Sequence, residues 1–177
     1  MAATRAILTT GVVYLRSLFA GSGGATGGPG ITIFSSTAAV TTVAGDLTTL
    51  ISYTLPANTL TRDGDRLEIE ASTTQAADAD IKTSAITFGA TVAAGRTAND
   101  NALARTLRAT IIRTGAATQI ASGTTETHGQ GDIMTHSTPG ETLSGTITIA
   151  LKGQNTTDTT SPSVTSRYMI VKFFPAP

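Results

Sequence analysis

The stretch ISYTLPANTLTRDGDRLEIE, residues 51–70, decides the fold, because it predicts a strand, a corner and a second strand. Apolar residues alternate with Ser and Thr from Ile51 to Leu55, which is the two-residue period of a strand with one buried face. Pro56 ends this strand because proline has no N–H to donate to a ladder. Alternation then resumes, with a second apolar face made by Leu67, Ile69 and Ala71.

Turn-forming residues separate these two strands. Asn58 and the triplet Asp63-Gly64-Asp65 supply the turn chemistry, and Gly64 can adopt a positive φ at no steric cost. The opposite face of the second strand carries Arg66, Glu68 and Glu70. Residues 51–70 therefore indicate the fold class but give no direct evidence of a catalytic or binding function.

Composition points to a β-rich domain without an electrostatic footprint. The 177 residues include 12 basic and 12 acidic side chains, and this balance argues against direct binding of nucleic acid or an anionic membrane. The absence of cysteine excludes disulfides, thiolate catalysis and cysteine-based zinc sites. Threonine is abundant, and its branched Cβ suits strands better than helices. Aromatic residues make up only 5%, so the core is thin and a subunit interface is favoured as a further source of burial.

From residue 31 onward, short alternating runs are separated by Gly, Pro, Asn or Asp. We predict strands over 31–34, 38–43, 46–55, 65–72, 81–88, 90–93, 103–113, 118–127, 143–152 and 166–174, with a loop over 128–140. Arg105 shares the apolar face of its run, so a bulge, an edge position or an ion pair is expected there. The predicted fold class is all-β: a jelly roll or β-sandwich of about eight to ten short antiparallel strands over residues 31–177, preceded by an N-terminal arm.

Residues 1–30 form the predicted arm and its Gly-rich tether. Leu8, Val12, Leu15 and Phe19 recur at helical spacing, although Thr9-Thr10-Gly11 leaves a short strand or an extended arm open. A secretory signal is the rival interpretation, but Arg16 interrupts the apolar run and also argues against a membrane span. Residues 21–30 have the composition of a flexible tether spanning about 15–20 Å. We therefore expect those four apolar residues to anchor the chain on a capsid or a neighbouring subunit.

The last predicted strand is apolar on both faces. One face carries Tyr168, Ile170 and Phe174, and the other carries Met169, Val171 and Phe173. A strand of this kind is normally covered on both sides. We interpret it as facing the domain core on one side and the arm or another subunit on the other; a central strand under a long loop is the alternative.

Candidate metal ligands are few. His128, Asp132 and His136 recur at four-residue intervals, which would place them on one face of a helix, but the surrounding glycines and Pro139 favour a loop. Asp63, Asp65, Asp78 and Asp80 resemble calcium ligands by type only, because the twelve-residue loop with its closing Glu is missing. We predict no cofactor, and we read these aspartates as turn formers.

No catalytic arrangement stands out. A Gly-x-Ser-x-Gly elbow is absent, and Glu68 and Glu70 are predicted to share one strand face rather than to oppose each other across a cleft. We interpret them as an exposed polar face paired with arginines. The basic cluster of Arg96, Arg105, Arg108 and Arg113 lacks the interleaved aromatics of a single-stranded nucleic-acid site and is predicted to meet acids on a partner or on the same sheet.

Several short motifs in order resemble a β-domain found in virion proteins of tailed bacteriophages. The pattern runs from YTLPANTL, DGD and LEIEA in residues 53–71 through AITFG at 85–89 and IIRTG at 111–115 to IASG at 120–123. It closes with ITIALKGQ at 147–154 and FFP at 173–175, so the resemblance covers roughly residues 47–175.

The resemblance implies a jelly-roll-like domain that forms homotrimers on a virion and has no catalytic residues. Such domains serve as capsid decoration (cement) proteins, head fibres or distal parts of tail fibres. Our first hypothesis is a trimeric decoration protein on the outer surface of the head, bound to the major capsid protein and stabilising the shell. The second is a tail-fibre tip or lectin-like module that contacts host glycans through the loops of 122–140. A non-viral β-sandwich adhesin is a third possibility that rests on composition alone.

Overall fold

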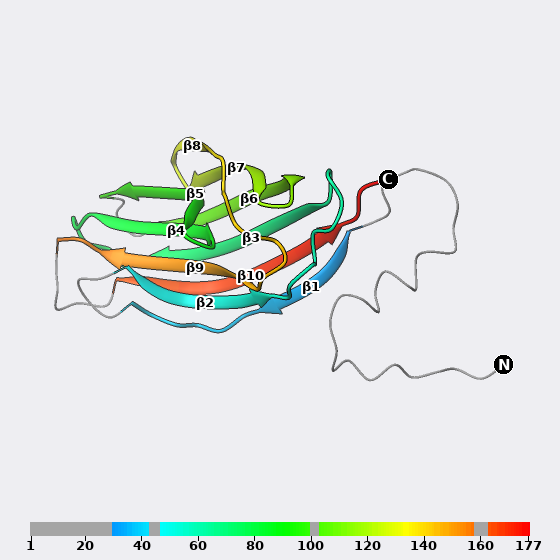
Figure 1. Cartoon of the computed structure of the whole chain (residues 1–177). Coiled ribbons are helices and arrows are strands. Elements are labelled where there is room, and N and C mark those ends of the chain that lie inside the picture. The colour runs from blue at the N-terminus through cyan, green and yellow to red at the C-terminus, as the bar shows by residue number, and fades with distance from the viewer. Residues whose placement is uncertain (1–29, 43–46, 100–102, 158–162) are drawn as a thin grey trace.

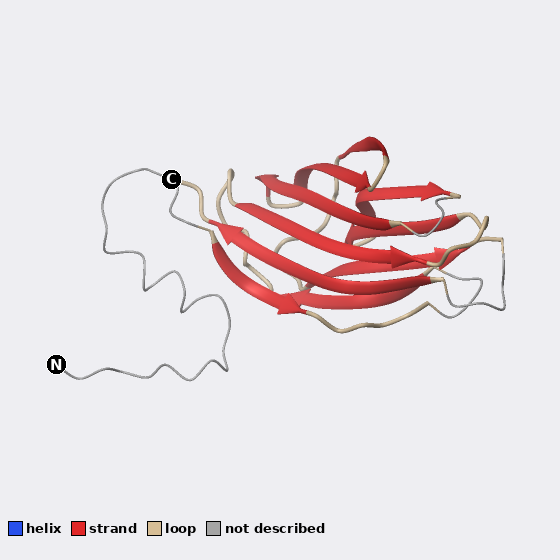
Figure 2. Ribbon diagram, turned by 180° about the vertical axis from the view of Figure 1, so that it is seen from behind, coloured by secondary structure: helices blue, strands red, loops and turns tan. Residues whose placement is uncertain are grey.

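A computed structural model describes residues 30–42, 47–99, 103–157 and 163–177, and these residues form ten strands and no helix. Figure 1 shows them as two packed layers, and Figure 2 shows the same layers from behind. The strands are β1 (Ile31–Ser36), β2 (Thr48–Leu55), β3 (Arg66–Gln75), β4 (Lys82–Phe88), β5 (Thr91–Ala98), β6 (Ala104–Gly115), β7 (Thr118–Thr127), β8 (Gln130–Ser137), β9 (Ile147–Asn155) and β10 (Val164–Phe174). Within the described part of the chain, no helix is long and apolar enough to cross a membrane.

The strand order is that of a jelly roll with one added hairpin. One sheet has the order β1-β10-β3-β6-β7-β8 and the other has the order β2-β9-β4-β5, with every pairing antiparallel. Without β7 and β8, successive strands divide between two four-stranded sheets in the eight-strand arrangement of a jelly roll. The β7–β8 hairpin extends the first sheet beyond β6. The predicted all-β sandwich is therefore confirmed, and the jelly-roll order gives its topology.

The core lies between the two sheets and follows from the alternation of each strand. The inward faces of β3 and β6 meet those of β4 and β9, as the two-residue period requires. The Phe34 and Tyr53 rings stack at 4.9 Å between centroids at one side of the sandwich. The large apolar side chains that are essentially inaccessible to solvent are Leu55, Leu60, Leu67, Ile69, Ile86, Phe88, Leu107, Ile111, Ile149, Leu151, Val164, Met169, Val171 and Phe173.

The corner of residues 51–70 carries the chain from one sheet to the other. β2 belongs to the four-stranded sheet and β3 to the six-stranded sheet, so the predicted strand, corner and strand are confirmed. Gly64 has a φ of 90° and Asn58 a φ of 58°, both in the left-handed region that these residue types tolerate. The buried Asp65 carboxylate fixes the corner, accepting the backbone N–H groups of Thr61 at 2.7 Å and Arg62 at 2.8 Å.

Asp65 also joins this corner to two distant parts of the chain. Its second carboxylate oxygen accepts the N–H of Ala176, beyond the last strand, at 2.9 Å. Its backbone carbonyl accepts the N–H of Arg113, at the end of β6, at 3.0 Å. The Arg113 guanidinium in turn donates to the carbonyl of Leu60 and forms an ion pair with Asp63. One short segment therefore aligns the ends of β2, β3, β6 and β10.

Arg105 does not interrupt its strand with a bulge or an edge. β6 keeps its register through this residue, and β3 and β7 flank it on both sides. The side chain points into the sandwich, is fully buried, and donates hydrogen bonds to the carbonyls of Lys82, Arg96 and Ala98 at 3.0–3.3 Å. A buried guanidinium of this kind is tolerated because each donor finds an acceptor. It connects β6 to β4 and β5 across the layers.

Several predicted boundaries are wrong, and β5 ends at Ala98, five residues beyond the predicted end at residue 93. Residues 130–137 form β8 rather than a loop, because the turn at His128 and Gly129, where Gly129 has a φ of 79°, folds them back onto β7. The segment predicted as a strand over 38–43 contributes only an isolated bridge, Thr41 to Thr165, among its described residues. β9 begins at Ile147, four residues later than the prediction, because residues 143–146 form a turn whose Gly145 N–H donates to Thr142.

The Asp65 contacts predict a large loss of stability on removal of this carboxylate. In Asp65→Ala, three backbone donors lose their acceptor inside the folded domain, and we expect unfolding in urea to become easier by about 2–4 kcal/mol. Asp132→Ala, at an exposed position of β8, is the matched control and changes stability by less than about 0.5 kcal/mol. Equal midpoints for the two variants would contradict the role given to Asp65.

Gly123 is predicted to be required where β7 passes over β5. A Cβ at Gly123 would lie 2.2 Å from the carbonyl oxygen of Ala93 and 2.6 Å from the Cβ of Ala94. Gly123→Ala therefore pushes the backbones of β5 and β7 apart. We expect it to lower the free energy of unfolding in urea by about 1–3 kcal/mol.

The neighbouring strand provides the control for this substitution. A Cβ at Gly131 meets nothing within 4 Å, so Gly131→Ala is neutral or slightly stabilising. If the two alanine variants unfold alike, the close approach of β5 and β7 does not exist in solution.

Candidate functional site

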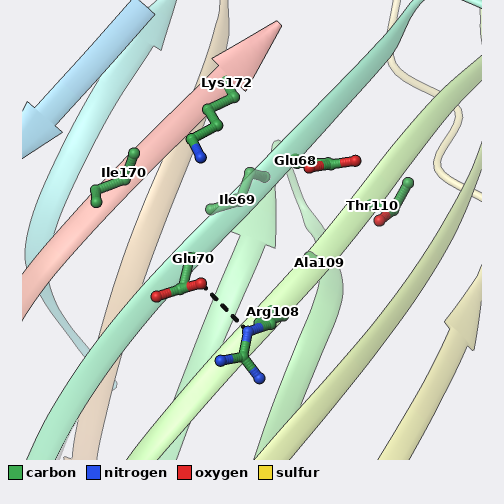
Figure 3. A pocket seen from close by; sticks show the side chains of 8 residues that line it. All are labelled: Glu68, Ile69, Glu70, Arg108, Ala109, Thr110, Ile170 and Lys172. Carbon is green, nitrogen blue, oxygen red and sulfur yellow. Dashed lines mark hydrogen bonds and ion pairs between the residues drawn. The ribbon is translucent and has the colours of Figure 1, made fainter. Parts of the chain in front are cut away.

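The outer face of the six-stranded sheet gathers the polar side chains that alternation directs away from the core. Cross-strand register places Lys172 beside Glu68 and Ile170 beside Glu70, and it places Arg108 on the other side of Glu70. Three strands that are distant in sequence, β10, β3 and β6, thus supply one continuous surface. Figure 3 shows these side chains on adjacent strands of that face.

Glu70 is the centre of a hydrogen-bonded network on this face. Its Oε1 accepts the hydroxyl of Tyr168 at 2.6 Å, and its Oε2 accepts Nε of Arg108 at 3.2 Å. Arg108 also donates to the Glu126 carboxylate on β7. A second pair, Arg66 with Glu68 at 3.1 Å, lies further along β3. The prediction that Glu68 and Glu70 form an exposed polar face paired with arginines is confirmed.

The network shifts the ionisation of its members. The hydrogen bond from Tyr168 and the proximity of Arg108 lower the pKa of Glu70, even though partial burial opposes this. The hydrogen bond that Arg108 donates to Glu70 raises the pKa of Arg108. Burial, together with the bond to Glu70, raises the pKa of Tyr168 to about 12. At neutral pH the face therefore presents an ionised carboxylate held between a phenol and a guanidinium.

A hollow of about 220 Å³ opens on this surface between β10, β3 and β6. Its lining combines two carboxylates, two cationic groups, one hydroxyl and a few apolar atoms: Glu68, Ile69, Glu70, Arg108, Ala109, Thr110, Ile170 and Lys172. Glu68 and Glu70 lie on the same strand face, and both are engaged by arginines. They do not oppose each other across a cleft in the manner of a glycosidase pair.

The last strand has the two faces that its sequence predicts. Met169, Val171 and Phe173 are buried in the core. Tyr168, Ile170 and Phe174 are half-buried on the outer face, where Phe174 lies 4.4 Å beneath the Arg66 guanidinium. Their assignment to a trimer interface or to contact with the arm stays a prediction. The other predicted anchors, Leu8, Val12, Leu15 and Phe19, lie outside the described residues.

The predicted metal ligands are not brought together. Residues 130–137 are extended, so Asp132 and His136 are separated by four strand positions, about 13 Å, and His128 lies beyond the hairpin turn. In the described ranges, no group of three or more His, Asp or Glu side chains could hold a metal ion. Asp65 is committed to backbone N–H groups, Asp78 to Lys82, and Asp80 to Asn155.

The basic residues of β5 and β6 do not form one cluster, so that prediction is wrong in its geometry. Strand alternation sends Arg105 into the core and Arg108 to the outer face, while Arg113 reaches the corner at Asp63. Arg96 donates to Gly131 and Gln130 of β8. The alternative in which arginines meet acids on the same sheet holds for Arg108.

Sequence reasoning missed the Tyr168–Glu70–Arg108 network. Its members are 98 and 38 residues apart in sequence and become neighbours only through the order β10-β3-β6. The available signal was the polar face of the second strand, which needed cationic and hydroxyl partners on its neighbours.

Replacing Tyr168 is predicted to raise the pKa of Glu70. In Tyr168→Phe the carboxylate loses the hydrogen bond that lowers its pKa most, and a carbon-detected NMR titration should show the shift. A lowered pKa adds stability that is present above the unfolded-state pKa and is lost as the pH falls through the folded-state value.

The same substitution should therefore flatten the dependence of stability on pH. Between neutral pH and about pH 3, Tyr168→Phe loses less stability than the unsubstituted protein does. Tyr53→Phe, in the other sheet, is the control and leaves the Glu70 pKa where it was. An unchanged Glu70 titration in Tyr168→Phe would mean that the hydrogen bond is not formed in solution.

No family model matches the sequence, and no curated protein matches it. Among solved structures, the chain is similar to the CBM2 module of the evolved Dit of Lactobacillus casei BL23 phage J-1. The TM-score is 0.41 and the identity 10%, over 71% of this chain and 69% of that chain. A likeness this low assigns neither a family nor a ligand to the chain.

Proposed function

We propose that this protein is a non-enzymatic structural protein of a bacteriophage particle, most specifically a homotrimeric decoration protein bound to the major capsid protein on the outer surface of the head. The observation that carries the proposal is where the phage-like motifs lie in the fold. They fall on β2, β3, β4, β6, β7, β9 and β10 and on the corner between β2 and β3. The resemblance therefore involves the residues that build the jelly roll.

The outer face of the four-stranded sheet supports a docking role. Its outward positions carry mostly threonine and serine, together with Val92, Gln154 and Lys152, and Lys152 is the charged side chain that faces outward on these four strands. The outward alanines Ala85 and Ala150 are nearly inaccessible to solvent. Depletion of charge is a feature of the centres of protein–protein interfaces, because few charges then have to be desolvated. We assign this face to contact with the capsid shell.

Binding of such a protein strengthens a shell by mass action. A ligand that binds only the assembled state stabilises that state by an amount that grows with its concentration. The predicted arm, residues 1–30, would extend each subunit to a neighbouring capsomer.

A host-binding module at the tip of a tail fibre is the second candidate. One observation favours it: Ile120 and Met134 project from the outward side of the β7–β8 hairpin and are 50% and 65% exposed. In this candidate function these two side chains are the contacts with the host surface, although exposed apolar residues that stand singly are also common on soluble proteins. The hairpin includes most of residues 122–140, which the sequence-based hypothesis of a tail-fibre tip predicts to contact the host.

The head assignment predicts a stabilised particle. Virions assembled without this protein should lose infectivity faster on heating and on osmotic shock, and adding purified trimer, checked by light scattering, should restore resistance. A chain lacking residues 2–20 should still form a jelly roll but bind these heads more weakly. Unchanged resistance, together with immunogold label on the tail tip, would replace the decoration role by the host-binding one.

A further inference from the structure

The hollow on the outer face of the six-stranded sheet is electrically balanced. Two carboxylates, Glu68 and Glu70, line it together with two cations, Arg108 and Lys172. An anionic ligand would meet the carboxylates, and a cationic ligand would meet the guanidinium and the ammonium, so neither gains a net Coulomb attraction. The hollow therefore favours a ligand without net charge.

The same four groups, with Thr110, offer hydrogen bonds of both kinds. Carboxylates only accept, guanidinium and ammonium groups only donate, and the threonine hydroxyl does both. A ligand hydroxyl can pair with any of them, because it donates and accepts at once. Ile170 adds an apolar wall against which C–H groups of a ligand can pack. This combination fits a compound with many hydroxyls on a carbon ring.

Part of the hollow is fixed before a ligand arrives. Glu70 is held on one side by Tyr168 and on the other by Arg108, and Arg108 is held again by Glu126. Exposed ion pairs of this kind add little to folding stability. Their physical effect is to order side chains, which lowers the entropy cost of binding.

The Lys172 ammonium group is a hydrogen-bond donor that pairs with no acceptor among the described residues. It is exposed, and among the described residues it makes no hydrogen bond or ion pair, whereas the other cation of the hollow, Arg108, is committed to two carboxylates. Figure 3 shows its amino group between β10 and β3, on the same face as Glu70. The ammonium is thus placed to donate to a ligand hydroxyl.

From these observations we propose that this hollow is a binding site for an uncharged carbohydrate, with Lys172, Glu68, Arg108 and Thr110 as its hydrogen-bonding groups. A volume of about 220 Å³ corresponds to that of about seven water molecules at roughly 30 Å³ each, which suits one sugar unit with the rest of a chain lying across the sheet. The site is independent of capsid attachment, because it lies on the sheet opposite the face assigned to the shell.

The test uses the full chain in affinity electrophoresis through gels that contain dextran, mannan, galactan, soluble starch or, as the anionic comparison, polygalacturonate. At least one neutral polysaccharide should retard the protein. Lys172→Ala should then weaken binding about tenfold or more, and Thr110→Val about threefold, the usual effect of losing a charged and a neutral hydrogen bond.

Matched substitutions on the opposite sheet control for charge and stability. Lys152→Ala and Thr148→Val remove the same groups from outward positions of β9 and should leave retardation unchanged. The proposal is overturned if none of the neutral polysaccharides retards the protein, if only polygalacturonate does, or if the variants of the two sheets behave alike. Capsid binding is measured in a separate experiment with phage heads. Failure of the sugar-binding proposal can therefore be distinguished from failure of the capsid-binding proposal.

Discussion

The Asp65 carboxylate is the interaction on which the two-layer arrangement depends. A jelly roll needs its chain to leave one sheet and enter the other at a defined angle, and backbone donors at such a corner have no ladder to join. One buried side chain accepts two N–H groups of the corner and one from the C-terminal segment. Near the end of β6, the Arg113 N–H also donates to the backbone carbonyl of Asp65. Asp65 therefore fixes the position of both sheets at this corner.

The corner was predictable because its signals are local. Alternation, Pro56 and the Asp-Gly-Asp triplet each act within a few residues, and the structure confirms all of them. β8 was not predictable in this way, since its Gly, Asp and His residues resemble a loop and its strand character comes from pairing with β7. Arg105 stood out in the sequence because a charged residue lay on the apolar face of its strand. Its hydrogen-bond acceptors could not be predicted, because they lie on β4 and β5, which are distant in sequence. The polar face of β3 was visible in the sequence, whereas its partners required the strand order.

The two outer faces of the sandwich differ in physical character. The four-stranded sheet presents small, nearly uncharged side chains that can be covered at low desolvation cost. The six-stranded sheet presents a network of paired charged side chains around a hollow. Such a surface is suited to directional hydrogen bonds with a small solute. A single domain of this size can therefore attach by one face while the other stays accessible. The proposed attachment and the proposed sugar site make use of this asymmetry.

The position of β10 between β1 and β3 has a consequence for the order of events during synthesis. The first strand of the domain pairs with the last, from Ile31 opposite Phe173 onward, so the six-stranded sheet cannot close until β10 has left the ribosome. Closure then requires a loop of nearly the whole chain, which makes folding slow relative to helical proteins of equal size. Until that step, β1 and β3 expose unpaired edges that invite pairing with other chains. In the proposed particle, assembly would therefore follow completion of each chain.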